Sequence, residues 1–205
     1  MMAAELDAAL AERLARVSFP TLGHFLEEGF ADHGIRALVP GKLVGRAVTL
    51  RLVGADALAV NDALALLQPG DVLVIDMGGD HAHAPVGAVT ACAAQCAGAR
   101  GVIVDGVVTD ILELRDTGLP IFARGTSVLT TKRRGLRESA INVDVVCGGV
   151  AVRPGDLVLA DDNGVLFTTV AKIAGLIDRA LQSDRAEPAI LARLRSGEKV
   201  GQVLG

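Results

Sequence analysis

Short apolar runs alternate with amphipathic stretches along the first part of the chain. Each apolar run is bounded by glycine, proline or charged residues, as buried strands are. The runs cover residues 47–52, 72–76, 102–105 and 120–123. Stretches with helical spacing lie between them, at residues 56–67, 86–97 and 111–117. This alternation is typical of parallel βαβ units, so we expect a parallel sheet covered by helices.

The pattern changes after residue 140. The turn sequences CGG, RPGD and DDNG separate short apolar segments at residues 141–147, 150–152, 157–160 and 165–169. This punctuation favours antiparallel hairpins. Helical stretches come at both ends of the chain, at residues 5–17, 21–28, 172–182 and 187–194. We expect a single domain over residues 1–205, with a mixed sheet and a C-terminal helical arm from about residue 171.

Composition narrows the classes of function. The 205 residues are 51% hydrophobic but contain no Trp, no Tyr and five Phe, and the net charge is −4. A chain with no basic stripe and no aromatic platform is not expected to bind nucleic acid. No signal peptide and no membrane-length apolar run is visible, so we expect a cytoplasmic protein with reduced thiols. Cys92 and Cys96 are interpreted as small buried helix residues.

The segment GVIVDGVVTD, from Gly101 to Asp110, carries the first candidate chemistry. Its apolar start predicts a buried strand, with Asp105 and Gly106 at the tip and Asp110 shortly after. Chemistry in open α/β folds sits just beyond the carboxyl ends of strands. Asp110 is therefore a candidate metal ligand; the alternative is a simple helix N-cap. Asp105 is interpreted as structural, turning the chain at the strand end.

A second candidate is the pair His81 and His83 in the loop GGDHAHAP. Alternating histidines can bind zinc or another transition metal, and His24 or Asp80 is available as a third ligand. The alternative is a solvated loop that binds no metal.

The order of several segments resembles the RraA-like family, which includes the RNase E activity regulator and the class II 4-hydroxy-4-methyl-2-oxoglutarate/4-carboxy-4-hydroxy-2-oxoadipate aldolases. The resemblance rests on GVIVDGVVTD, on LPIFARG from Leu119 and on VCGGVAVRPGDLVLADDNGV from Val146. Upstream, VGRAVTL and PGDVLVID also match. The resemblance implies an α/β protein with the β/β/α swivelling-type RraA-like fold. It also implies a homotrimer or homohexamer with sites between subunits.

For function, the resemblance implies a lyase that cleaves or decarboxylates a 2-oxo acid with the help of Mg²⁺ or Mn²⁺. The metal would act as a Lewis acid that stabilises the pyruvate enolate. Zinc or another transition metal is the alternative cofactor. The expected partners are a small carboxylate substrate and further copies of this chain, with no nucleic acid and no membrane.

Individual residues match the family's site. Asp110 corresponds to the metal-binding aspartate, and Asp105 with Gly106 to the pair before it. The loop Pro85, Val86, Gly87, Ala88 and Val89 corresponds to the segment whose backbone N–H groups hold the substrate carboxylate at a helix start. Glu187 resembles an acidic residue on the aldolases' C-terminal arm that reaches a neighbour's site and orients water.

Three positions depart from the family pattern. The motif arginine, which donates to the enolate oxygen, is Thr109 here; an acidic residue of the loop is Ala88; and an aspartate near the first helices is His24. Arg115 or Arg124 could replace the missing arginine in space. The C-terminal arm favours the aldolase branch, as a lyase with an altered substrate or reaction.

Two alternatives follow from the same departures. One is a non-catalytic, ring-shaped binding or regulatory protein. The other is an enzyme with a rebuilt site, in which His24, His81 and His83 act on another carboxylate substrate.

Overall fold

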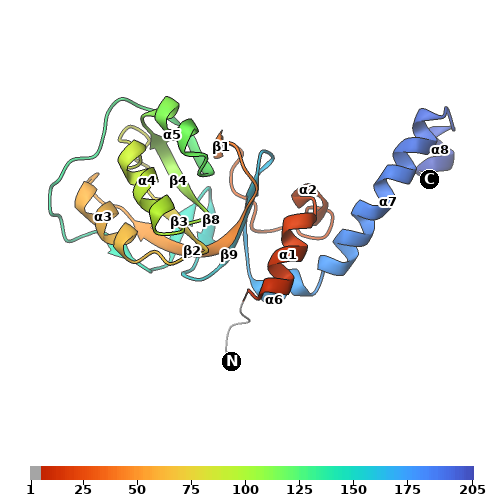
Figure 1. The fold of residues 1–205 in the computed structure, drawn as a ribbon, viewed down its shortest axis with the longest axis horizontal. Coiled ribbons are helices and arrows are strands. Elements are labelled where there is room, and N and C mark those ends of the chain that lie inside the picture. The colour runs from red at the N-terminus through yellow and green to blue at the C-terminus, as the bar shows by residue number, and fades with distance from the viewer. Residues whose placement is uncertain (1–5) are drawn as a thin grey trace. The chain divides into compact units, whose positions relative to one another are not determined.

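The computed structural model describes residues 6–205, which form two compact units (Figure 1). The larger unit is continuous and spans Glu28–Thr169. The smaller unit combines the two ends of the chain, the described part of residues 1–27 with Val170–Gly205. The helix expected from residue 5 begins at Ala8, and its first expected residue lies outside the described part of the chain.

The larger unit is built on one mixed sheet with strand order β1-β5-β4-β3-β2-β9-β10, in which β6 also pairs with β2. The strands are β1 (Arg36–Val39), β2 (Leu43–Arg51), β3 (Asp71–Asp76), β4 (Gly101–Val108), β5 (Ile121–Thr126), β6 (Ala140–Ile141), β9 (Leu157–Asp161) and β10 (Gly164–Thr168). The four central strands, β2 to β5, are parallel, whereas β1, β6, β9 and β10 pair antiparallel. The expected α/β fold with a mixed sheet is confirmed.

Helices cover one face of this sheet (Figure 1). They are α3 (Ala57–Ala65), α4 (Ala88–Cys96) and α5 (Ile111–Thr117). The alternation of side chains along a strand explains the two faces. In β3, Leu73 and Ile75 pack into the helix-side core, whereas Val72 and Val74 pack into a second core on the opposite face.

The second core is closed by a small hairpin, β7 (Val145–Cys147) and β8 (Val150–Val152), together with β9 and β10. Phe122 and Phe167 are among its buried side chains. Cys147 is fully buried there, and its pKa is raised by burial and by the negative charges of Asp105 and Asp76. This thiol is therefore held in its neutral, unreactive form.

The smaller unit brings helices from both ends of the chain together. These are α1 (Ala8–Arg16), α2 (Phe19–Leu22), α6 (Val170–Ala174), α7 (Ile177–Arg195) and α8 (Val200–Val203). Asp184 of α7 accepts hydrogen bonds from the Ser18 N–H, at 2.7 Å, and from the Thr21 hydroxyl. The Arg179 guanidinium lies 4.7 Å from the centre of the Phe25 ring.

Some element boundaries differ from the sequence expectation. The helix expected at residues 21–28 ends at Leu22, and the strand expected at residues 141–147 is divided because Asn142 adopts a φ of 53°. The two closing helices were expected at residues 172–182 and 187–194, but α6 ends at Ala174 and α7 runs from Ile177 to Arg195 through Pro188. Cys92 and Cys96 are exposed rather than buried, so their interpretation as core residues is wrong.

No helix in the described residues combines the length and the apolar character needed to cross a membrane.

Candidate functional site

Strand β4 extends three residues beyond its expected end, to Val108. Asp105 and Gly106 therefore lie within the strand, at an irregularity of its pairing with β5 between Val104 and Val107, and not at its tip. Val107 and Val108 pair with β5 again after this irregularity, and Thr109 and Asp110 follow directly after the strand.

Asp110 adopts a left-handed conformation, with φ 53° and ψ 44°, in which a non-glycine residue is strained. It stands at the N-cap position of α5, but its side chain does not cap that helix. Instead, Asp110 Oδ2 accepts the Ala88 N–H at 3.0 Å, and Oδ1 accepts the Thr109 hydroxyl at 3.3 Å. The simple cap interpretation therefore accounts for the position of Asp110 and not for its exposed carboxylate.

The loop of residues 85–89 lies directly against Thr109 and Asp110. The Thr109 N–H donates to Val86 O at 2.9 Å. Gly87 is the N-cap of α4, and a Cβ atom at this position would overlap the Asp110 carboxylate and come within 2.8 Å of Thr109 Cγ2. Only glycine lets the backbone at position 87 come this close to Thr109 and Asp110. The first N–H groups of α4 therefore lie next to the Asp110 carboxylate. We call Thr109, Asp110 and residues 85–89 the Asp110 site.

His83 is paired with Asp80 rather than with another histidine. His83 Nδ1 lies 2.7 Å from Asp80 Oδ2, while Asp80 Oδ1 accepts the N–H groups of Ala82 at 2.9 Å and of His83 at 3.1 Å. Burial opposes ionisation of Asp80, but these hydrogen bonds outweigh it and lower its pKa. His81 is exposed and takes no part in this arrangement.

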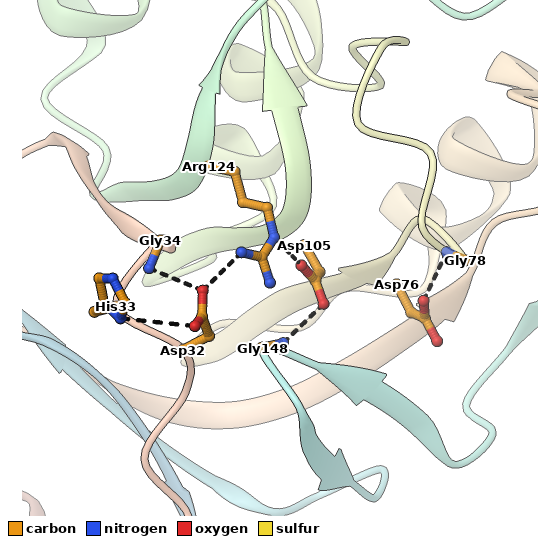
Figure 2. A network of polar contacts seen from close by, with 8 residues as sticks. All are labelled: Asp32, His33, Gly34, Asp76, Gly78, Asp105, Arg124 and Gly148. Carbon is orange, nitrogen blue, oxygen red and sulfur yellow. Dashed lines mark hydrogen bonds and ion pairs between the residues drawn. The ribbon is translucent and has the colours of Figure 1, made fainter.

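A charged cluster lies on the other face of the sheet, next to the hairpin β7–β8 (Figure 2). Arg124 of β5 donates to Asp105 Oδ1 at 2.5 Å and to Asp32 Oδ1 at 2.7 Å. Asp105 Oδ2 also accepts the Gly148 N–H of the hairpin turn, at 2.8 Å. The hydrogen bond from Arg124 lowers the pKa of Asp32. Asp105 therefore joins β5 and the hairpin turn from within a strand, and does not turn the chain at a strand end as expected.

Neither arginine considered as a replacement for the motif arginine is placed in the Asp110 site. The Arg124 guanidinium is held between two carboxylates on the face opposite the helices, and only 24% of its side chain is exposed. Arg115 lies in the last turn of α5 and is exposed, whereas Asp110 precedes the first turn. The polar side-chain group next to Asp110 is therefore the neutral Thr109 hydroxyl and not a guanidinium.

Two predicted site residues, His24 and Glu187, belong to the smaller unit. His24 follows α2, and Glu187 lies in the middle of α7; both are exposed. The role of Glu187 in a neighbouring subunit's site and the role of His24 as a metal ligand or rebuilt-site residue stay predictions.

Within the described residues, no three His, Cys, Asp or Glu side chains lie together in a way that could hold a metal ion. Asp80, His81 and His83, which all belong to the larger unit, therefore do not form a zinc centre by themselves, since zinc sites in proteins use three or four such ligands. The exposed Asp110 carboxylate remains as a single candidate ligand at the Asp110 site. Magnesium and manganese accept this arrangement, because they keep several waters and use few carboxylates.

Sequence reasoning did not find the Asp32–Arg124–Asp105 cluster or the Asp80–His83 pair. Charged residues inside the apolar segments GVIVDG and LPIFARG were the available signal for the first. For the second, the spacing of three residues between Asp80 and His83 was visible, but loop conformation decides whether such a pair meets.

Comparisons with known proteins agree with this architecture. Residues 7–167 match the RraA-like family described as Aldolase/RraA. A protein of Halalkalibacterium halodurans named "Putative 4-hydroxy-4-methyl-2-oxoglutarate aldolase" is 38% identical over 148 residues, which are 72% of this chain and 70% of the relative. A protein of Hahella chejuensis with the same name is 32% identical over 151 residues, covering 74% of this chain and 88% of that relative.

Solved structures show the same fold. RraAS2 of Streptomyces coelicolor, described as an unusual member of the RNase ES inhibitor RraA protein family, has a TM-score of 0.77 and 31% identity and covers 93% of this chain and 98% of its own. An uncharacterized protein from Pseudomonas syringae pv. tomato superposes with a TM-score of 0.83 at 24% identity, covering 98% of both chains. The chain belongs to the RraA-like family, a family of mixed α/β proteins that includes aldolases and RraA regulators.

Proposed function

We propose that this protein is a lyase that acts on a 2-oxo acid at the Asp110 site, by retro-aldol cleavage or decarboxylation, with the help of a divalent cation. The observation that carries the proposal is the exposed Asp110 carboxylate, held in a strained backbone conformation against the N-terminus of α4. The names of the relatives from Halalkalibacterium halodurans and Hahella chejuensis support the same class of reaction.

Asp110 would hold the cation, with waters and substrate oxygens as the other ligands. Magnesium or manganese fits a single carboxylate of this kind, and zinc fits it poorly. A bound cation would supply Lewis-acid polarisation of the substrate's 2-oxo group.

The N-terminus of α4 would bind the substrate carboxylate. The first N–H groups of a helix have no partner within the helix, and they attract anions. In this chain the Ala88 N–H donates to Asp110, and the groups of Val89 and Thr90 follow in the same turn. A substrate carboxylate bound there would lie next to the cation held by Asp110.

The test is the exchange of pyruvate methyl protons in D₂O, followed by proton NMR with and without Mg²⁺. This partial reaction requires enolate formation and does not depend on which aldol substrate is natural. We expect metal-dependent exchange by the wild type and its loss in Asp110→Ala. Asp116→Ala, which removes an exposed carboxylate from the same helix α5, is the control and should exchange at the wild-type rate.

A non-catalytic regulatory function is the second candidate, and the residues Ala88 and Thr109 favour it. Neither side chain can orient water as a carboxylate does or donate to an enolate as an arginine does. RraAS2, at 31% identity, is described as a member of an inhibitor family. A wild-type protein that exchanges no pyruvate protons at any Mg²⁺ or Mn²⁺ concentration would favour this function over the lyase.

We also propose that the chain assembles as a trimer or a dimer of trimers, with Glu187 of one subunit near the Asp110 site of the next. Exposed apolar side chains next to the site support this. Val128, Val89 and Leu112 are 98%, 84% and 69% exposed, and burial between subunits would remove these apolar side chains from water. The Ser127 N–H donates to Val108 O at 2.9 Å, which holds Val128 near the end of β4.

A further inference from the structure

Asp80 holds His83 in an orientation that suits proton transfer. An ionised carboxylate only accepts hydrogen bonds, so at 2.7 Å from Asp80 Oδ2 the His83 Nδ1 must carry the proton. Neutral His83 then has its free lone pair on Nε2. The second Asp80 oxygen is fixed by the N–H groups of Ala82 and His83, so the orientation of the ring is set by the loop itself.

The loop that carries this pair runs along the end of β4, where the Asp110 site lies. At one end of the loop, Asp80 O packs against Gly106, where an added Cβ atom would lie 3.2 Å from it. At the other end, Val86 O accepts the Thr109 N–H at 2.9 Å. His83 lies between these two attachments. The loop that carries His83 therefore contacts β4 and the residue after it on both sides of His83, and this strand leads into Thr109 and Asp110.

A third attachment limits the movement of the loop next to His83. The Ala84 N–H donates to Leu129 O at 2.8 Å, and the Thr131 N–H donates to Ala84 O at 3.2 Å. The His83 side chain is 28% exposed, which leaves the ring accessible while most of its surface is packed. A preorganised but accessible imidazole is what proton transfer to a substrate requires.

Within one subunit, Thr109, Asp110 and residues 85–89 include no side chain suited to this task. Retro-aldol cleavage needs a base for the substrate hydroxyl and an acid for the enolate carbon. Ala88 and Thr109 offer neither at neutral pH, and Asp110 is committed to the cation in the proposed function. Histidine is the side chain whose ordinary pKa suits both steps.

We propose that His83 is the proton-transfer residue of the Asp110 site and that Asp80 is its positioning residue. This inference rests on the proposed function. His83 Nε2 accepts the proton of the substrate's 4-hydroxyl group as the C3–C4 bond breaks. The bonding electrons move to C3 and form the enolate, and the carbon that bore the hydroxyl becomes a carbonyl. The imidazolium then returns its proton to C3, which yields pyruvate and restores neutral His83.

The pyruvate exchange assay tests the proposal with the full-length protein and Mg²⁺. In this reaction Nε2 removes a methyl proton and returns a deuteron. We expect His83→Ala to lower the exchange rate by roughly 100-fold or more, the usual contribution of a general base. Added imidazole should restore part of the rate in this variant, which it would not do if the ring had only a structural part.

The variant His83→Asn separates loss of the base from loss of folding. Its side-chain amide can still donate to Asp80 but has no basic nitrogen, so we expect a folded protein with exchange as slow as in His83→Ala. Asp80→Asn should slow exchange less than loss of the ring. The control is His33→Ala: His33 also has an aspartate neighbour, with Nδ1 3.7 Å from Asp32 Oδ2, but its side chain is fully exposed and lies outside the Asp110 site.

The outcomes separate the two proposals. Exchange by wild type and His33→Ala with slow exchange by His83→Ala and His83→Asn supports the proton-transfer residue. Equal exchange by all four proteins overturns it and leaves the lyase standing. No exchange by the wild type overturns the lyase and the inference together.

Discussion

The Arg124 Nε–H donates to Asp105 Oδ1 across 2.5 Å, at the point where β4 and β5 lose their regular pairing. The same guanidinium reaches Asp32, and Asp105 also accepts the Gly148 N–H (Figure 2). One arginine therefore connects β5, the irregular part of β4, the segment before β1 and, through Asp105, the hairpin β7–β8. The cluster stabilises the larger unit on the face opposite the Asp110 site.

Removing this guanidinium should destabilise the fold. Arg124→Met leaves the partly buried Asp105 carboxylate without its cation, at a cost of about 2 kcal/mol in the free energy of unfolding. Urea unfolding followed by circular dichroism measures the difference. Arg115→Met, which replaces an exposed arginine at the end of α5, is the control. Equal unfolding midpoints for the two variants would show that the cluster adds nothing to stability.

Stability should fall in acid because three carboxyl groups have lowered pKa values. Asp32 is paired with Arg124, whereas burial of Asp56 and Asp80 is outweighed by backbone N–H donors. Below the ordinary pKa of 3.8 the unfolded chain takes up protons that the folded chain resists, so folding weakens until the folded groups are protonated too. The contribution is complete above about pH 5. Urea midpoints between pH 6 and pH 3 measure it.

Asp56→Asn provides the comparison for this pH dependence. The Asp56 carboxylate accepts the N–H groups of Leu58, Arg134 and Leu136, and an amide cannot titrate in their place. The variant should be less stable at pH 6 and should lose less stability between pH 6 and pH 3 than the wild type. An identical slope in both proteins would remove Asp56 from the explanation.

Gly87→Ala should impair the Asp110 site without unfolding the protein. Its methyl group would overlap the Asp110 carboxylate, which must then move away from α4. Displacement of a catalytic group by about 1 Å can cost roughly 100-fold in rate, so pyruvate exchange should fall at least ten-fold. Gly125→Ala adds the same methyl group in open space on β5 and should exchange normally. Unchanged exchange in Gly87→Ala would mean that the site tolerates the shift.

Thr109→Arg should raise the rate of pyruvate exchange. An arginine at this position adds a charged donor for the enolate oxygen, and single donors of this type typically contribute roughly 100-fold or more. We expect at least a ten-fold gain. Thr109→Gln provides comparable polarity without the charge and should show no gain. A rate below that of the wild type would indicate that the arginine does not reach the substrate.

Replacing Val128 with aspartate should weaken the proposed assembly. A charge at this fully exposed apolar position opposes burial between subunits, so light scattering at micromolar concentration should return smaller particles than for the wild type. Leu66→Asp, at the C-terminal end of α3, is the control for a charged substitution at an exposed apolar residue. A wild type that is already a monomer would contradict the proposed trimer.

The sequence predicted the parallel strands well because each of them coincides with a local run of apolar residues. Strand β3, for example, was expected at residues 72–76 and is observed at Asp71–Asp76. Strand β1 was missed, since its four residues obtain their strand character from pairing with β5. The break at Asn142 and the passage of α7 through Pro188 were missed because tertiary context overrode the local preference there.

The candidate site was predicted unevenly for a similar reason. The family motif indicated Asp110 and the loop of residues 85–89, and the structure brings these together through Ala88 and Val86. The bulge at Asp105 could not be predicted, because it depends on the register between β4 and β5. The Asp80–His83 contact depends on loop conformation, which hydrophobic patterning does not encode.

The two units differ in when they can form during synthesis. Residues 28–169 are continuous, so the sheet with the Asp110 site can fold as soon as this stretch has left the ribosome. Helices α1 and α2 emerge first but pack against α7, whose Asp178 and Asp184 contact Arg13 and Ser18. The apolar side chains of Leu14 and Leu22 therefore stay uncovered until α7 has been translated. During that interval the nascent chain presents a natural target for chaperones.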